Sequence, residues 1–402
     1  MIPNIPFVDS QSPASTVCEA ERSNDPIAEQ PDAGDLIATF LRQAWRENSD
    51  YSSITSELLE RITPLLIKSG AGPLAWWRIR KSPLASTSCG AQLHNSYRLS
   101  TLQVEMQLLG IRKAFALLRA AGIEPVLVKG FSVARLYPEF GLRPFSDIDL
   151  VVHPDRYDAA SALLEGPEGR RVPVDLHNGF DGLGADSYDE YFSHSQLERA
   201  GDFDLRVLAP EHELRALAFH MLRHEAFRPL WLADIAIAVE RPPNFDWQLC
   251  FGADRRRADW VACAIGLAHY LLGACIEDTP VAERATKLPS WLISTVLECW
   301  SRPFAADYGP NRHVASMTKY VRDPRGLVAD LRNRWPGAIE ATMSVRGPFN
   351  RLPRWPFQLA NCLQRAARFA KRLPRTWSEG RDDRENETVE TTEWALFERA
   401  PE

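Results

Sequence analysis

The chain has 402 residues, of which 45% are hydrophobic and 25% are charged. These proportions are ordinary for a globular protein, and the length allows two or three domains with a substantial core. The formal net charge of −6 disfavours a general nucleic-acid-binding protein, because such proteins bind through a basic surface. A small anionic substrate needs only local positive charge and is not disfavoured.

Seven cysteines are scattered along the sequence without paired C-x-x-C spacing. This pattern favours reduced thiols over a disulfide framework or a zinc site. The first residues contain no basic segment followed by an apolar run, and no window reaches 18 apolar residues. We therefore expect neither a signal peptide nor a membrane-spanning helix, and we predict a cytoplasmic protein.

The N-terminal part is predicted to be a tail followed by helices. Residues 1–34 are rich in Pro, Ser, Asp and Glu, which is typical of disorder. A helical segment is expected over 35–124. Its clearest helix is 99–121, ended by Gly122, and one apolar stripe repeats along it: Val104, Leu108, Ile111, Phe115 and Leu118.

The stretch from residue 125 to residue 153 has the alternation of strand and turn that is expected of a functional core. It predicts a buried strand at 126–128, then a Lys-Gly-Phe-Ser turn that opens a short helix. A loop leads into a second strand that carries Asp147 and Asp149. We expect the sheet to continue to about residue 210.

A helix is expected at about 154–164, followed by further strands at 172–178 and 203–208. In the first of these, Asp175 and His177 alternate with apolar residues and therefore share one face. From residue 211 the sequence is almost entirely helical, with one long helix expected over 246–272, and we predict a helical domain over 211–340.

The C-terminal part, 341–402, is predicted to contain a helix at 355–375 and an acidic disordered tail. The helix has an apolar stripe beside several Arg and Lys residues. It is suited to an anionic membrane surface or an acidic partner, but a peripheral helix with a solvated basic face is the reading that we favour.

Two acids on one strand suggest metal chemistry. Residues two apart project to the same side, so Asp147 and Asp149 should point together. Two carboxylates at roughly 4 Å repel by about 4 kcal/mol at an effective dielectric of 20, and a divalent cation removes this repulsion. With Asp175 from a neighbouring strand, three acids would suffice to hold two metal ions for a phosphoryl-type displacement.

The turn at Gly130 supplies elements of a phosphate site. Glycine lets the backbone approach a phosphate closely, and the short helix that follows offers free N–H groups. Ser132 could donate a hydroxyl, and Lys129 or Arg143 could neutralise charge. In the alternative interpretation, Gly130 only makes a turn and the acids are solvated residues at strand ends.

Two further polar features lie in the helical region. His220 and His224 are four residues apart on a helix and share a face, which allows zinc binding, simple packing or a surface role. Asp234 lies within the apolar run LWLADIA and is expected to pair with another group, with Arg223 and His220 as candidates.

The run L-V-K-G-x-S…L-Y-P…G-L-R-P-x-S-D-I-D-L-V-V, followed by V-D-L-H, resembles an uncharacterised nucleotidyltransferase family of the DNA polymerase beta-like superfamily. The later H-E-L…H-M-L-R-H…L-W-L-A-D-I-A resembles the helical segment that follows this family's core, and this resemblance suggests a place near the nucleotide or acceptor for His220 and His224. The resemblance covers roughly residues 99–240. It implies an α+β fold: a minimal nucleotidyltransferase core, with a mixed sheet flanked by helices, between N-terminal helices and a C-terminal helical domain.

The resemblance also implies a function. Asp147, Asp149 and Asp175 would be catalytic metal ligands for Mg²⁺ or Mn²⁺, with an NTP such as ATP as donor and pyrophosphate as product. Asp175 would also help to deprotonate the acceptor hydroxyl. Relatives are associated with bacterial biosynthetic clusters, which implies a small-molecule, sugar or peptide acceptor and no nucleic acid.

Two departures from the family pattern motivate an alternative function. Phe131 separates Gly130 from Ser132, where the superfamily's turn is usually Gly-Ser or Gly-Gly, and only 25 residues lie between Asp149 and Asp175. A catalytically weak nucleotide-binding or regulatory module with the same fold would be consistent with both.

Overall fold

A computed structural model describes residues 32–47, 52, 54–180, 187–240, 244–277, 279–302 and 335–379. The predicted N-terminal tail lies outside these residues up to position 31, and the acidic C-terminal tail lies outside them from position 380. The first described helix, α1, begins at Ala33.

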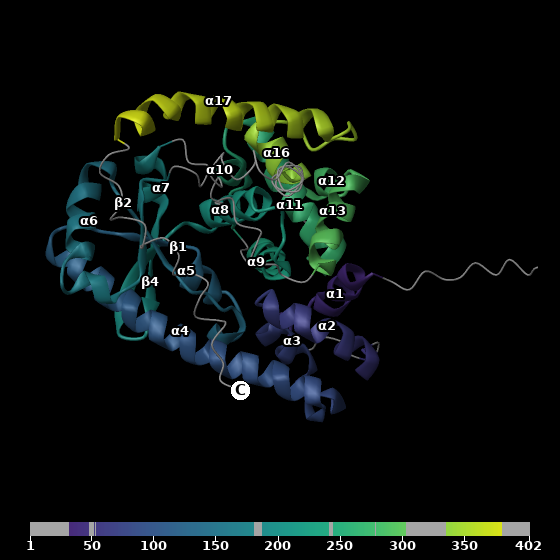
Figure 1. Ribbon diagram of the computed structural model, residues 1–402. Helices are drawn as coiled ribbons and strands as arrows, with labels where there is room; N and C mark the ends of the chain where they lie inside the picture. Colours follow the sequence, from purple (N-terminus) through teal and green to yellow (C-terminus); the bar gives the residue numbers. More distant parts are fainter. Residues whose placement is uncertain are drawn as a thin grey trace, which may run out of the picture. The chain divides into compact units, whose positions relative to one another are not determined.

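The helices of the described residues carry the labels of Figure 1. The α-helices are α1 (Ala33–Leu41), α2 (Ser56–Lys68), α3 (Gly72–Ile79), α4 (Ser88–Ala120), α5 (Gly130–Ala134), α6 (Tyr157–Glu165), α7 (Tyr188–His194), α8 (Pro210–Arg223), α9 (Pro229–Val239), α10 (Trp247–Phe251), α11 (Arg255–Leu272), α12 (Ala282–Ala285), α13 (Ser290–Ser301), α16 (Ala338–Ser344) and α17 (Trp355–Glu379). Short 3₁₀ helices are η1 (Pro83–Ser86), η2 (Phe140–Leu142), η3 (Pro154–Arg156) and η4 (Gly169–Arg171).

A mixed five-stranded sheet forms the centre of the fold. Its strands are β1 (Val126–Val128), β2 (Ile148–Val152), β3 (Val174–Asn178), β4 (Gln196–Ala200) and β5 (Phe203–Val207). They lie in the order β3-β2-β1-β5-β4. β1 runs antiparallel to β2 and parallel to β5, while β2 and β3 are parallel and β4 and β5 form a hairpin. This arrangement confirms the predicted α+β fold with a mixed sheet flanked by helices.

Each face of the sheet packs against its own set of helices. On one face, side chains of α4 and α6 share a core with Leu127, Leu150 and Val207 from the strands. On the other face, Val126, Val128 and Val151 pack with residues of α7 and α8. Because β1 is covered on both sides, all of its side chains are buried, which explains its unbroken apolar sequence.

Helix α4 is longer than predicted and carries two apolar stripes. It begins at Ser88, eleven residues before the predicted start, where the hydroxyl of Thr87 accepts from the N–H of Gly90. The predicted stripe faces the sheet, although Leu108 is only partly buried. A second stripe is exposed and consists of Leu99, Leu102, Met106 and Leu109.

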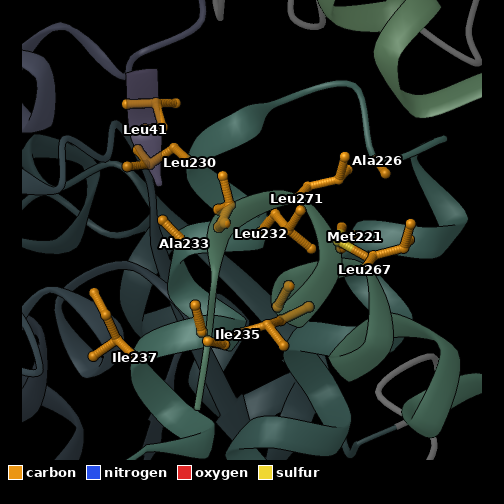
Figure 2. Packing of buried hydrophobic residues seen from close by; sticks show 14 of the residues in the cluster. Leu41, Met221, Ala226, Leu230, Leu232, Ala233, Ile235, Ile237, Leu267 and Leu271 are labelled. Atoms are coloured by element: carbon orange, nitrogen blue, oxygen red, sulfur yellow. The ribbon is translucent and has the colours of Figure 1, made fainter. Parts of the chain in front are cut away.

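The largest core joins the N-terminal helices to helices that follow the sheet in the sequence. Side chains of α1, α2 and α3 pack in one cluster with side chains of α8, α9, α11 and α13. Figure 2 shows part of this cluster, with Leu41 of α1 among side chains that include Leu232 and Leu271. Two of the predicted segments, 35–124 and 211–340, thus share one core. The predicted division into segments 35–124, 125–210 and 211–340 stays a proposal.

The helices after residue 240 differ from the prediction at Gly252. The single helix expected over 246–272 is two helices, α10 and α11, because Gly252 breaks the run with a φ of +64°. In α17, Trp355, Leu359 and Leu363 are exposed. Among the described helices, none is long and apolar enough to cross a membrane.

Candidate metal centre and active site

The turn after β1 has an unusual backbone conformation. Lys129 has a φ of +55° and Gly130 a φ of +44°. Positive φ is uncommon for a lysine and is found where the surroundings enforce it, often at functional sites. A Cβ atom on Gly130 would also lie 3.2 Å from the Phe145 ring, so both the positive φ and the close approach favour glycine here.

The buried carboxylate of Asp149 lies at the centre of the site. Asp149 is opposite Val128 in the sheet and is only 2% exposed. Its Oδ1 accepts a hydrogen bond from Lys129 Nζ at 2.7 Å and lies 2.9 Å from His177 Nε2. Burial alone would raise the pKa of Asp149, but the hydrogen bond from His177 and the charge of Lys129 outweigh it and lower the pKa. The carboxylate is therefore ionised.

Strand β3 brings two more ligand groups to Asp149. β3 runs parallel to β2, with Asp175 in register with Asp149. His177 follows on the same face, as the sequence predicted, and its Nε2 lies 3.4 Å from Asp175 Oδ2. One ligand atom from each of the three residues lies within 4.8 Å of the others. No other group of three such residues meets this distance in the part of the chain that the structure describes.

This donor set fits a divalent cation. Two carboxylate oxygens suit Mg²⁺ or Mn²⁺, whereas the imidazole nitrogen of His177 is typical of Mn²⁺, Zn²⁺ and other transition metals. The sequence placed Asp175 and His177 on one face, yet His177 was not included in the predicted ligand set. The alternation V-D-L-H was the signal for it.

Asp147 is not one of the three residues of this group. The predicted strand with both acids is wrong at its start, because β2 begins at Ile148 and Asp147 belongs to the preceding loop. Its carboxylate accepts a hydrogen bond from Ser146 at 3.3 Å, and its charge acts on Arg143 and Arg228. Residues two apart share a face only where the strand is regular, and the strand is not yet formed at Asp147.

Ser132 and Arg143, two of the predicted phosphate ligands, make contacts inside the protein. The Ser132 side chain is completely buried and its hydroxyl donates to Glu213 of α8. Arg143 is 7% exposed and its guanidinium pairs with Asp234 of α9 at 2.9 Å. The predicted role of either residue in phosphate binding stays a prediction.

The buried carboxylate of Asp234 has two partners, and neither was predicted. Arg143 pairs with it and the hydroxyl of Tyr137 donates to it at 2.7 Å. Burial opposes ionisation of Arg143, but the charge of Asp234 outweighs it and raises the pKa of the guanidinium. Burial and the charge of Asp234 together raise the pKa of Tyr137 well above its usual range. The prediction of Arg223 or His220 as the partner was therefore wrong.

The His220 and His224 rings are neighbours, as their spacing predicted, with centroids 4.7 Å apart. Both also contact Trp231 of α9. Burial lowers the pKa of His220 well below its usual value and that of His224 to about 4, and the charge of Lys129 contributes to both shifts. The two rings are therefore neutral near pH 7 and lie within the electrostatic reach of Lys129.

One of three comparisons with known proteins, the one with family models, agrees with the resemblance. No curated protein and no solved structure matches the chain. A family model described as "Uncharacterised nucleotidyltransferase" matches residues 55–169. The match includes the Lys129 turn and Asp149, while Asp175, His177 and helices α8 and α9 lie beyond it. Residues 55–169 are thus similar to this nucleotidyltransferase family, whose description indicates transfer of a phosphorus-containing group.

Proposed function

We propose that the protein is a divalent-metal-dependent nucleotidyltransferase. It would move a nucleoside monophosphate from an NTP to a hydroxyl or phosphate of a small molecule, sugar or peptide, and release pyrophosphate. The observation that carries this proposal is the convergence of Asp149, Asp175 and His177 at a lysine-glycine turn, within and next to the segment that matches the family.

The three converging residues would hold the metal ion. Asp147, which leads into β2, is proposed as a further ligand. A bound divalent ion would supply positive charge that stabilises the negative charge developing on the transferred phosphoryl group. The low pKa of Asp149 keeps its carboxylate ready to bind the ion at neutral pH.

Side chains of the protein would assist the transfer itself. The acceptor oxygen would attack the α-phosphorus as the bond to the β-phosphate oxygen breaks and pyrophosphate leaves. The proton of an acceptor hydroxyl would go to Asp175, whose side chain is 56% exposed and therefore accessible. Lys129, whose side chain is 20% exposed, is suited to neutralise phosphate charge next to the ion.

The proposed acceptor is not a nucleic acid, and the proposed compartment is the cytoplasm. The net charge of −6 disfavours a nucleic-acid acceptor. The described cysteines are all unpaired, which favours a reducing compartment such as the cytoplasm. A membrane or protein contact through residues 355–375 stays a prediction, and the exposed Trp355, Leu359 and Leu363 are compatible with it.

The test is transfer of label from each α-labelled NTP to candidate acceptors, with Mg²⁺ or Mn²⁺ present. We expect labelled acceptor and pyrophosphate in equal amounts, and loss of both in Asp149→Asn and Asp175→Asn. Asp155→Asn, which removes a carboxylate with an 88% exposed side chain, should leave transfer unchanged. Transfer that persists at the wild-type rate in Asp149→Asn would exclude this site.

One observation favours the alternative of a catalytically weak nucleotide-binding module. The Lys129 ammonium contacts Asp149 Oδ1 directly, so an ion that binds this oxygen must compete with the lysine. If the protein binds a metal–NTP complex but releases no pyrophosphate with any acceptor tested, the binding module is the better description.

A further inference from the structure

The hairpin of α8 and α9 leaves one group of side chains partly exposed. Between Glu211 and Val239 every residue is buried except six: His220, Arg223, His224, Phe227, Arg228 and Trp231. All six are aromatic or cationic. We refer to His220, His224, Phe227, Arg228 and Trp231 as the hairpin cluster.

We propose that the hairpin cluster is the nucleoside subsite of the nucleotidyltransferase, where the base of the NTP stacks while its phosphates lie at Lys129 and the metal centre. This inference rests on the proposed function and adds to it a location and a chemistry for base recognition. None of the cluster residues lies in the segment that matches the family.

Buried polar contacts join both helices of the hairpin to the segments that flank the metal centre. On α8, Glu213 accepts from Ser132 of α5, the helix that follows Lys129. His220 lies seven residues further on and therefore on the same face of α8. On α9, Asp234 pairs with Arg143, which precedes β2. Trp231 lies three residues before Asp234, again on the same face.

The electrostatics agree with this placement. The charges of Lys129 and Asp149 both act on His220, and that of Lys129 also acts on His224. The charge of Asp147 acts on Arg228. The cluster is therefore within the field of the residues proposed to bind metal and phosphate, as a base attached to bound phosphates would require.

The chemistry of the cluster suits a planar aromatic ligand. The His220 and Phe227 rings lie 4.6 and 4.7 Å from Trp231, in edge-to-face geometry. The Arg228 guanidinium is 5.3 Å from the same indole. Partly exposed aromatic and guanidinium planes stack on nucleobases. The neutral imidazoles of His220 and His224 can each donate and accept hydrogen bonds with the base edge.

The test compares two ligands that share phosphates but differ in the base. Dissociation constants of labelled NTPs and of inorganic tripolyphosphate are measured with Mg²⁺ or Mn²⁺ for the wild-type protein and for Trp231→Leu. The control is Trp355→Leu, since Trp355 is an exposed tryptophan of α17. We expect Trp231→Leu to weaken NTP binding at least about tenfold, from the loss of one stacking partner. Binding of tripolyphosphate should change less than about twofold.

A second variant, Phe227→Leu, keeps the test informative if Trp231→Leu does not fold. If circular dichroism shows that Trp231→Leu is not folded, Phe227→Leu removes a half-buried ring from the same cluster and should also weaken NTP but not tripolyphosphate binding. Wild-type affinity for NTPs in both variants would overturn the subsite. If the wild-type protein binds tripolyphosphate as tightly as NTPs, the subsite is excluded while the phosphate site stands. If it binds neither, the proposed function itself is excluded.

Discussion

Asp149 combines nearly complete burial with a negative charge. A buried carboxylate is unfavourable unless it is paired, and here Lys129 and His177 both contact the same oxygen. A lysine with positive φ is also unfavourable unless its surroundings enforce it. These features occur together at a position where a metal–phosphate site is proposed, so we attribute the strained turn to the site rather than to stability.

Replacement of Asp149 by Asn should destabilise the protein. The change leaves the Lys129 ammonium, whose side chain is 20% exposed, without a charged partner. Removal of one member of a buried pair costs about 3–5 kcal/mol, and the remaining exposure of Lys129 reduces this to about 2 kcal/mol. Urea unfolding at pH 7 measures the loss. Asp155→Asn, at an exposed carboxylate, should change stability by less than about 0.5 kcal/mol.

The contribution of Asp149 to the stability of the fold should depend on pH. The folded-state pKa of Asp149 is lowered below the unfolded value of about 3.9. Its stabilising effect is therefore complete above about pH 5 and is lost as the pH falls through the folded-state pKa. The stability difference between wild type and Asp149→Asn should be constant from pH 7 to pH 5 and shrink in stronger acid. A difference that grows below pH 4 would contradict this pKa assignment.

At the scale of elements, buried polar pairs attach the α8–α9 hairpin to the segments around the metal centre. Ser132 of α5 and Arg135, which follows α5, contact Glu213 of α8. Arg143 and Tyr137 contact Asp234 of α9. A purely apolar interface would also hold these elements together, but it would specify their relative position less tightly. We infer that the polar pairs hold the hairpin cluster at a defined distance from Lys129.

Asp234→Leu tests this attachment. It leaves the Arg143 guanidinium buried without its partner and should cost about 3–5 kcal/mol. The double variant Arg143→Met/Asp234→Leu removes both charges and should recover part of that loss. Urea unfolding of both variants measures the effect. Glu283→Ala, which breaks the exposed pair with Lys287, serves as control and should leave the stability nearly unchanged, because exposed ion pairs contribute little. A double variant as unstable as the single one would mean that the loss is one of packing.

Glu225 links the same hairpin to α16. It follows His224 with a φ of +59°, and its carboxylate accepts from the N–H groups of Ile339 and Glu340 at the start of α16. A Cβ at Gly337 would overlap the carboxylate, so the helix can approach this closely only because a glycine precedes it. Burial raises the pKa of Glu225 to about 7, although the two N–H groups oppose the shift.

The raised pKa of Glu225 predicts that its contribution to stability falls as the pH rises, which is opposite in sign to the contribution of Asp149. Because the folded-state pKa is raised, Glu225 stabilises the fold most below an unfolded value of about 4.3, and the contribution is lost as the pH rises through about 7. Between pH 5 and pH 8 the loss should be about 2–3 kcal/mol. Glu225→Gln should flatten the stability profile over this range in urea unfolding. A profile that keeps the wild-type slope would assign the slope to other groups.

At the scale of the whole molecule, the local parts of the fold were predictable from the sequence. The apolar run at Val126, the turn at Gly130 and the alternation around Asp175 are patterns within a few residues, and each appears in the structure. The inward stripe of α4 was also predicted, since a period of 3.6 residues is readable without knowledge of the fold.

Features that depend on distant contacts could not be predicted. Arg143 and Asp234 are 91 residues apart, and no local pattern pairs them. The start of β2 at Ile148 lies where β1 ends and β3 begins, so the sequence around Asp147 and Asp149 could not show that only Asp149 lies in the strand. The exposed stripe of α4, which includes Leu102 and Met106, has the same spacing as a buried stripe. The core that α1–α3 share with the later helices also depends on contacts between residues far apart in the sequence, so it was not predicted.

The central claim is that Asp149 and its neighbours bind a metal–nucleotide complex. The most direct test is equilibrium dialysis of labelled NTPs with and without Mg²⁺ or Mn²⁺, for wild type, Asp149→Asn and Asp175→Asn. Asp175 is exposed, so its replacement should leave the fold intact. We predict metal-dependent binding that weakens at least about tenfold in both variants and is unchanged in Asp155→Asn. Binding that needs no metal, or that both variants retain in full, would contradict the account.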